Sequence, residues 1–270
     1  MAMRVAIAHP DLGLGGAERL IVDAAQTLCD RGHEVVVYTA RHDPARCFEE
    51  TRSGAFKVVV RGGWIPRHVF GRLHALCAYA RCVWLAMCLA LALRGRVDAV
   101  LCDQVSAMVP VLHALLWRSA PTLFYCHFPD MLLASRATLL RRLYRAPVDC
   151  VEQASTGCAS TVLVNSRYTG GVFAQTFAAL HARGLKPKVL YPAVDLAAHA
   201  PPASTAEKAA TERCVPEGVL ESPGTDSLLL SINRFERKKV RPSVSEVALV
   251  GLPARMLLRS RAHRPGAELF

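Results

Sequence analysis

Short apolar runs alternate with longer stretches of helical periodicity over the first 195 residues of the chain. The first run, at residues 4–8, precedes a glycine-rich stretch and then apolar residues at helical spacing, which are Leu20, Ile21, Ala24, Ala25 and Leu28. Gly32 stands where the C-terminal cap of that helix belongs, and residues 34–40 form the next apolar run. The pattern predicts two strands joined through a helix by a right-handed crossover.

The same alternation continues beyond this first unit. It predicts further strands at residues 57–60, 98–102, 122–126, 161–164 and 188–191. Helical stretches lie between most of them, at 71–93, 106–118, 135–159 with a break at Pro147, and 168–183. Buried strands that alternate with helices are typical of an α/β protein with a doubly wound, Rossmann-like parallel sheet.

The pattern changes after Asp195. Residues 196–226 are rich in Ala, Pro, Ser, Thr and Glu and show poor periodicity, which indicates a linker or, as the alternative, a frayed helix. A single strand-like run at 228–232 opens a second domain within residues 227–239. Residues 240–270 are rich in Arg, Pro and Ser and are too short to bury a core, so we expect a disordered tail. The predicted organisation is one complete domain at 1–195 and an incomplete second one.

Composition narrows the class of protein. A chain of 270 residues that is 52% hydrophobic excludes wholesale disorder, and 33 Lys and Arg against 22 Asp and Glu give a net charge of +11. That charge favours phosphate-rich partners such as nucleotides, anionic lipid headgroups or nucleic acid. The cysteines are scattered singly without a CxxC pair, and a strand-like run follows the first residues. We therefore expect a cytosol-facing protein with no cleaved signal peptide and no metal site.

The glycine-rich stretch is the first candidate for chemistry. Gly15 and Gly16 stand at the mouth of the first helix, where backbone N–H groups and the positive helix end favour an anion. A dinucleotide fingerprint needs a third glycine where Glu18 stands and an acidic residue after the second strand, where Thr39, Ala40 and Arg41 stand. The pattern thus argues against a nicotinamide cofactor. A tight turn that needs glycine for conformation alone remains the alternative.

Two further candidates follow predicted strands. Asp103 follows the strand at 98–102, and His127 with Asp130 follows the strand at 122–126. The carboxyl ends of parallel strands share one edge of the sheet, where open α/β folds bind ligands. His127 is therefore placed to touch a substrate. The alternative is a loop histidine that bonds a backbone carbonyl.

A run of cations follows the strand at 228–232. Arg234 and Lys239, with Arg237 and Lys238 between them, can converge from one loop on a diphosphate, the arginine as a fork and the lysine as a point charge. The alternative is a solvated charged face. The chain shows no strip of basic residues interleaved with aromatics, so we expect no nucleic-acid partner.

Residues 82–93 form an uninterrupted apolar run with arginines on both sides. A helix that spans a bilayer needs about 20 apolar residues, so this run is too short to cross. A helix of this kind can lie in the membrane interface, with Trp84, Leu85 and Leu89 among the acyl chains and the arginines against headgroups. An ordinary buried helix of the α/β core is the alternative.

Several of these segments together resemble one family. They are HPDLGLGGAERL, CDQVSA, FYCHFPDMLL, RRLYRAPVD, VLVNSRYT, VLYPAVD and LLLSINRFERKK, in this order between residues 5 and 239. The chain resembles the mannosyltransferases of dolichol-linked oligosaccharide assembly, which are retaining GT-B glycosyltransferases of the family 4 type.

The resemblance implies an enzyme at the cytosolic face of the endoplasmic reticulum membrane. It implies transfer of mannose from GDP-mannose to mannosyl-chitobiosyl-diphosphodolichol in α1,3 and α1,6 linkages, with no cofactor, and other glycosyltransferases of the pathway as candidate partners. His127 matches the family's catalytic histidine beside the transferred sugar. The residues that match the donor-diphosphate site are Gly15, Gly16, Arg234 and Lys239. Glu18, Asp103 and Asp130 are weaker candidates for the acceptor cleft.

The match ends at Lys239. The family continues through a second Rossmann-like domain with a Glu-x7-Glu motif, whereas residues 240–270 show no counterpart. We therefore expect a truncated form with little activity alone, because transition-state stabilisation needs both walls of the cleft. A non-catalytic, membrane-associated module that binds acceptor lipid or partner enzymes is the alternative function.

Overall fold

The computed structural model describes residues 1–54, 56–71, 73–116, 120–134 and 136–193. The predicted linker, second domain and tail lie outside these residues, as do Arg234 and Lys239.

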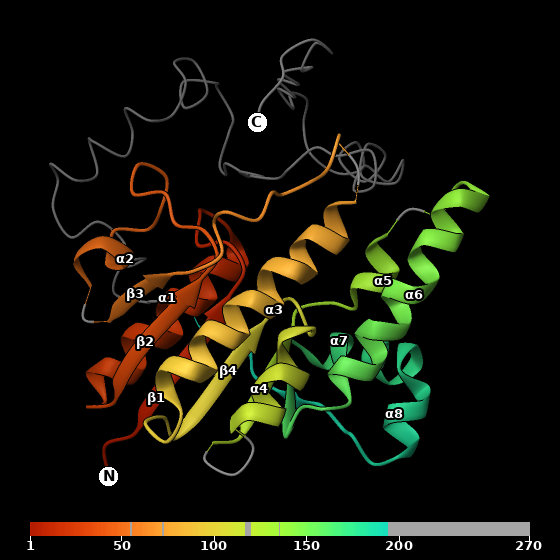
Figure 1. The fold of residues 1–270 in the computed structure, drawn as a ribbon. Coiled ribbons are helices and arrows are strands. Elements are labelled where there is room, and N and C mark those ends of the chain that lie inside the picture. The colour runs from red at the N-terminus through yellow and green to blue at the C-terminus, as the bar shows by residue number, and fades with distance from the viewer. Residues whose placement is uncertain (55, 72, 117–119, 135, 194–270) are drawn as a thin grey trace, which may run out of the picture. The chain divides into compact units, whose positions relative to one another are not determined.

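The described residues form one parallel sheet of seven strands (Figure 1). In chain order these are β1 (Arg4–His9), β2 (Glu34–Thr39), β3 (Lys57–Val60), β4 (Ala99–Asp103), β5 (Thr122–Cys126), β6 (Thr161–Val164) and β7 (Lys188–Val189). Their order across the sheet is β3-β2-β1-β4-β5-β6-β7, and every neighbouring pair is parallel. Each strand begins within one residue of its predicted start, and the doubly wound α/β fold is confirmed.

The helices connect these strands. They are α1 (Gly16–Asp30), α2 (Glu50–Ser53), α3 (His74–Leu93), α4 (Met108–Leu116), α5 (Asp130–Leu133), α6 (Leu139–Thr156), α7 (Arg167–Thr176) and α8 (Ala178–Ala182). Gly32 follows α1 with a φ of 81°, in the left-handed region that the predicted cap requires. The predicted break at Pro147 is wrong, because α6 continues through it. Pro147 is exposed there, so water can satisfy the carbonyl that loses its helical partner.

The core has two apolar clusters, one on each face of the sheet. Alternate residues of β1 serve them: Ala6 and Ala8 belong to the cluster shared with α3 and α4, whereas Val5 and Ile7 belong to the cluster shared with α1. Figure 1 shows α3 and α4 in front of the sheet and α1 behind it. Both faces of β1 are therefore covered, and its buried polar side chain is confined to its carboxyl end.

The sheet order reverses between β1 and β4. The chain leaves β1 toward β2 on one side and leaves β4 toward β5 on the other. Loops that part in this way open a crevice at the carboxyl ends of the two strands, which is where open α/β sheets bind ligands. Here the two strands end at His9 and Asp103.

Candidate active site

Two histidines flank one buried carboxylate at this switch point. Nδ1 of His9 lies 2.8 Å from Oδ2 of Asp103 in a hydrogen bond. On the other side, Nε2 of His127 lies 2.8 Å from Oδ1 of Asp103, an ion-pair distance without the direction of a hydrogen bond. The side chains of His9 and Asp103 are fully buried, whereas His127 keeps a quarter of its side chain exposed. His127 is therefore the member of this array that can meet a ligand.

The charges in the array support one another. Glu18, in the first turn of α1, places Oε1 3.9 Å from Nε2 of His9. Burial lowers the pKa of His9, but its contacts with Asp103 and Glu18 outweigh burial and raise the pKa to about 9. Burial likewise works against ionisation of Asp103, yet the two histidines hold its pKa below the usual value. At neutral pH, His9 is thus an imidazolium between two carboxylates.

Three side chains support the loop after β5, which carries His127. Asn165, after β6, donates from Nδ2 to the carbonyl oxygen of His127 at 3.1 Å. Glu152 of α6 accepts from the backbone N–H of Asp130 at 2.7 Å and from that of Met131 at 2.8 Å, so it caps α5. The ring of Tyr125 packs on His127 with centroids 4.8 Å apart. These contacts fix the position of the His127 backbone.

Charged side chains of α6 contribute to this support. Burial raises the pKa of Glu152 to about 7, although the two N–H groups it accepts from lower it. Arg145 is buried and pairs with Asp130 and Asp149, each at 2.9 Å. Asp130 therefore forms an ion pair with α6, and the structure does not bring it to the histidines.

The glycine stretch lies beside the array. Gly15 is the N-cap of α1 and has extended backbone with no side-chain cap. A Cβ on Gly15 would collide with the carboxylate of Glu18, whereas Gly16 has open space around it. The glycines therefore keep the start of α1 bare and leave room for Glu18 to reach toward His9. Within the described residues, no group of three or more His, Cys, Asp or Glu side chains is arranged to hold a metal ion.

A family of known proteins matches most of the chain. The model of glycosyltransferase family 4 matches residues 14–198.

The chain belongs to glycosyltransferase family 4.

Within family 4, several curated relatives that the chain matches carry the name alpha-1,3/1,6-mannosyltransferase ALG2. The relative from Rhizomucor pusillus is 46% identical over 239 residues, which cover 88% of this chain and 49% of the relative. The human relative is 45% identical over 252 residues, covering 92% of this chain and 56% of the relative. The chain spans about half the length of the curated relatives it matches.

Solved structures confirm the fold alone. Sucrose-phosphate synthase from Thermosynechococcus elongatus has a TM-score of 0.54 and 16% identity, over 79% of this chain and 53% of that one. The catalytic domain of starch synthase IV from Arabidopsis thaliana has a TM-score of 0.50 and 12% identity, over 76% of this chain and 54% of that one. This family 4 chain thus matches about half of each of these two GT-B-like structures.

The structure brings together part of the predicted site. Asp103 and His127 lie together, as strand-end reasoning predicts, and Glu18 and the glycine stretch lie beside them, whereas Asp130 pairs with Arg145 of α6. Sequence reasoning missed His9, which ends β1 and satisfies the same strand-end rule, and it missed Asn165, which follows β6. Glu152 had no local signal, because it acts from the middle of a helix on a loop 22 residues earlier.

Helix α3 corrects the predicted membrane contacts. It is the one helix in the described part of the chain that is long and apolar enough to cross a membrane, and a core helix meets the same criterion. Leu85 and Leu89 are fully buried against the sheet and α4, so the prediction that they contact lipid is wrong. Residues 82–93 are apolar on all sides of the helix, so packing determines which side faces the sheet. Trp84 is exposed and packs edge-to-face on Trp64.

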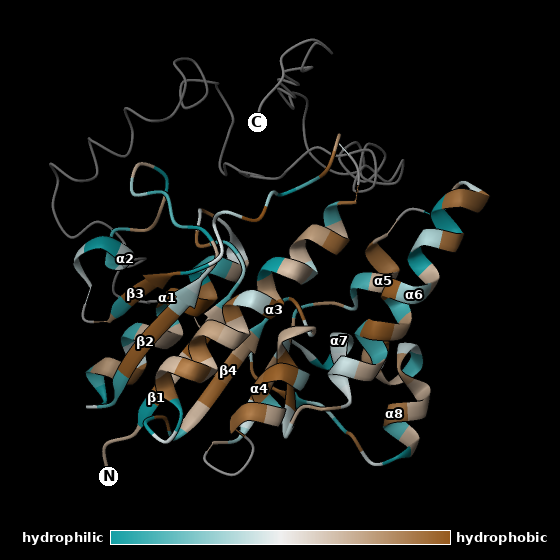
Figure 2. Cartoon of the chain, in the orientation of Figure 1, coloured by the Kyte–Doolittle hydropathy of each residue, from teal (hydrophilic) through white to brown (hydrophobic). Residues whose placement is uncertain are grey.

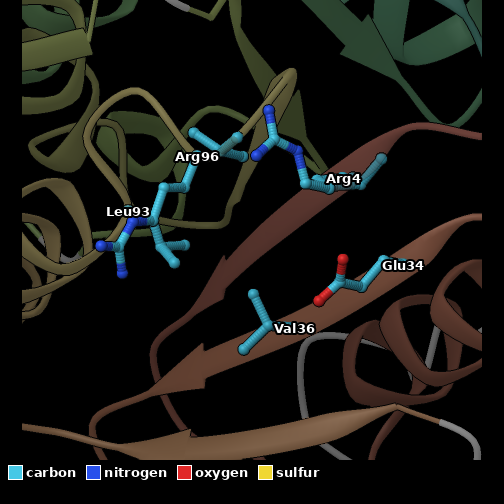
Figure 3. Close-up of a pocket in the computed structure, with 7 residues that line it drawn as sticks. Arg4, Glu34, Val36, Leu93 and Arg96 are labelled. Carbon is cyan, nitrogen blue, oxygen red and sulfur yellow. The ribbon is translucent and has the colours of Figure 1, made fainter.

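A small depression lies at the opposite edge of the sheet (Figure 3). Arg4, Glu34, Val36, Leu93 and Arg96 line it at the amino ends of β1 and β2, together with Val5 and Val97. Arg4 is engaged there by Asp98, with Nη2 3.2 Å from Oδ1. The depression is remote from the carboxyl ends of the strands, so it is not part of the candidate active site.

Proposed function

We propose that this chain forms the acceptor-side half of a retaining mannosyltransferase of N-glycan precursor assembly. It would transfer mannose from GDP-mannose to mannosyl-chitobiosyl-diphosphodolichol in α1,3 and α1,6 linkages. The observation that carries this proposal is the partly exposed ring of His127 at the switch point, in a chain 45% identical to a human relative named for that activity. Residues 1–195 form this half, 196–226 the linker, and 227–239 the start of the donor-binding domain.

The proposal gives the glycines, His127 and the two cations separate roles. The bare N-terminus of α1 at Gly15 and Gly16 offers backbone N–H groups to the donor diphosphate. His127 touches the transferred sugar from the other side of the crevice. Arg234 and Lys239, outside the described residues, would neutralise the leaving diphosphate.

The decisive experiment measures mannosyl transfer from labelled GDP-mannose to a short-chain diphospho-chitobiosyl-mannose acceptor. The chain is compared with a version extended by the second half of the human relative. We expect transfer by the extended protein, little by the chain alone, and a loss of at least about 100-fold on His127→Ala in the extended protein. His181→Ala on α8 is the matched control and should be silent.

Failure of the extended protein to transfer mannose would contradict the proposal. Binding of the acceptor lipid without transfer would instead support the non-catalytic module. Full transfer by the chain alone would show that the predicted second wall is not needed.

We further propose that the protein works at the cytosolic face of the endoplasmic reticulum membrane. Leucines at the start of α6 support this, because Leu139, Leu140 and Leu143 are each at least 65% exposed. They lie near the start of α3, since Leu76 donates its backbone N–H to the Tyr144 hydroxyl at 3.2 Å. Figure 2 shows hydrophobic residues at this end of α6 and along α3. The basic residues among them are Arg136, Arg141 and Arg142.

A bilayer interface with anionic headgroups suits this combination of leucines and arginines. Replacing Leu139, Leu140 and Leu143 together by Glu should lower flotation with phosphatidylserine-containing vesicles at least about tenfold, because exposed apolar area then no longer enters the interface. Tyr168→Glu, at an exposed position of α7, is the control. Leu91→Glu is a separate variant at the far end of α3. Loss of flotation with L91E alone would place the contact on residues 82–93 instead.

A further inference from the structure

His9 has no role in the activity proposed above, although it lies between two carboxylates at the switch point. Its side chain is fully buried, so it cannot touch a substrate in this structure. An imidazole in such a place costs free energy unless its nitrogens are satisfied. Nδ1 has Asp103, whereas Nε2 is buried without a hydrogen bond and faces Glu18 at 3.9 Å.

Each carboxylate oxygen of Asp103 faces a different histidine. Oδ2 accepts from His9, and Oδ1 lies against Nε2 of His127. A carboxylate that holds Nε2 of an imidazole favours the tautomer with the proton on that nitrogen, which leaves Nδ1 as an acceptor. Contacts of this kind are often poorly aligned without substrate and tighten in the complex.

We propose that His9 and Asp103 are positioning residues that present His127 to the substrate as a neutral ring with Nδ1 as the acceptor. The proposal rests on the proposed function only for the identity of that substrate, a sugar whose hydroxyl would donate to Nδ1. His9 acts through Asp103: its positive charge balances the buried carboxylate, so the carboxylate does not draw a second proton onto His127. An uncompensated Asp103 would make His127 a cation and a donor.

Two further titratable side chains, Glu18 and Tyr125, lie against the array and are compatible with this arrangement. Glu18 of α1 faces His9 on its far nitrogen and helps to keep it protonated. Tyr125 of β5 packs on the His127 ring with its hydroxyl directed away, because that hydroxyl donates to the carbonyl of Leu190 at 2.8 Å. The described contacts of Asp103 involve the two histidines, so the charge state of one histidine is passed to the other through a single carboxylate.

Nitrogen-15 NMR of the full 270-residue chain tests this without any substrate. The His127 resonances are identified as those lost in His127→Gln. In the unmodified protein we expect the proton of the neutral ring on Nε2, the nitrogen that faces Asp103, and none on Nδ1. We also expect a second, smaller inflection of the His127 signals as His9 loses its proton at about pH 9. A proton on Nδ1 of the neutral ring would overturn the proposal.

Two variants separate positioning from a merely structural role. His9→Gln keeps a donor toward Asp103 but removes the charge, and it should raise the proton affinity of His127 at least about tenfold. Asp103→Asn should redistribute the proton between the two ring nitrogens. His42→Gln, on a partly buried histidine that bonds Thr51 at 2.9 Å, is the matched control and should leave His127 unchanged. Unchanged His127 titration in H9Q would refute the role of His9.

Kinetics gives a readout that distinguishes this proposal from the function itself. In a protein that transfers mannose, His9→Gln should move the acidic limb of the pH–rate profile up by about one pH unit, because His127 must be neutral. If no transfer is measured but the NMR results hold, the proposed function fails and the positioning role stands. An acidic limb that does not move in H9Q contradicts the positioning role alone.

Discussion

Replacing Leu89 by glutamate is expected to unfold the domain. Leu89 is fully buried in the cluster that α3 shares with α4 and the sheet. Removal of a buried leucine alone costs about 2–5 kcal/mol, and burial of a carboxylate without a partner adds several more. That total is comparable to the whole stability of a typical domain, about 5–15 kcal/mol. Circular dichroism at room temperature should show loss of helix, with no cooperative transition in urea.

Leu91→Glu is the matched control, because it makes the same change two residues away on the same helix. Leu91 is 69% exposed, and a surface substitution changes stability by about 0.5 kcal/mol or less. The two variants should therefore differ by at least about 3 kcal/mol in the free energy of unfolding. Equal stability of L89E and L91E would mean that α3 does not pack on the sheet through Leu89.

The free energy of unfolding should fall between about pH 6.5 and pH 9, by up to about 3 kcal/mol. His9 has a folded-state pKa of about 9 against an ordinary value of 6.5, so the folded state holds its proton more tightly. Burial opposes this, and the bonds to Asp103 and Glu18 more than overcome it. The stabilisation is complete below pH 6.5 and is lost as the pH rises through about 9. Urea unfolding at closely spaced pH steps measures it.

His9→Gln should remove most of this slope, because glutamine does not titrate. Glu152 acts with the same sign but in a lower window, since its pKa rises from 4.5 to about 7. The difference between the unmodified chain and H9Q therefore isolates His9 above about pH 7. An equal slope in both proteins would show that Asp103 and Glu18 do not hold the proton on His9.

Most of the fold follows from the sequence because each strand is a short apolar run between loops. The face of α3 could not be predicted in this way. Leu85 and Leu89 point to the core while Leu91 and Trp84 are exposed, yet all four are apolar and give no contrast between faces. Contact with α4 and the sheet determines which face of α3 is buried. The periodicity of the sequence does not report that contact.

The candidate site was predictable to the extent that it obeys the strand-end rule. Asp103 and His127 follow their strands, so their shared edge can be deduced from the alternation of strands and helices alone. His9 obeys the same rule, but it stands just before the glycine-rich turn, whose pattern is the stronger local signal. The bonds from Glu152 and Asn165 join separate elements, and no local pattern announces them.

The central place of β1 in the sheet also governs how the protein is made. Its bonded neighbours are β2 and β4, and the His9–Asp103 pair joins residues 94 positions apart. During synthesis, β2 emerges soon after β1, but the other edge of β1 stays open until β4 has left the ribosome. An open, apolar strand edge is a template for pairing with another chain. The stretch of nascent chain from β1 to β4 therefore needs protection from such pairing until β4 has emerged.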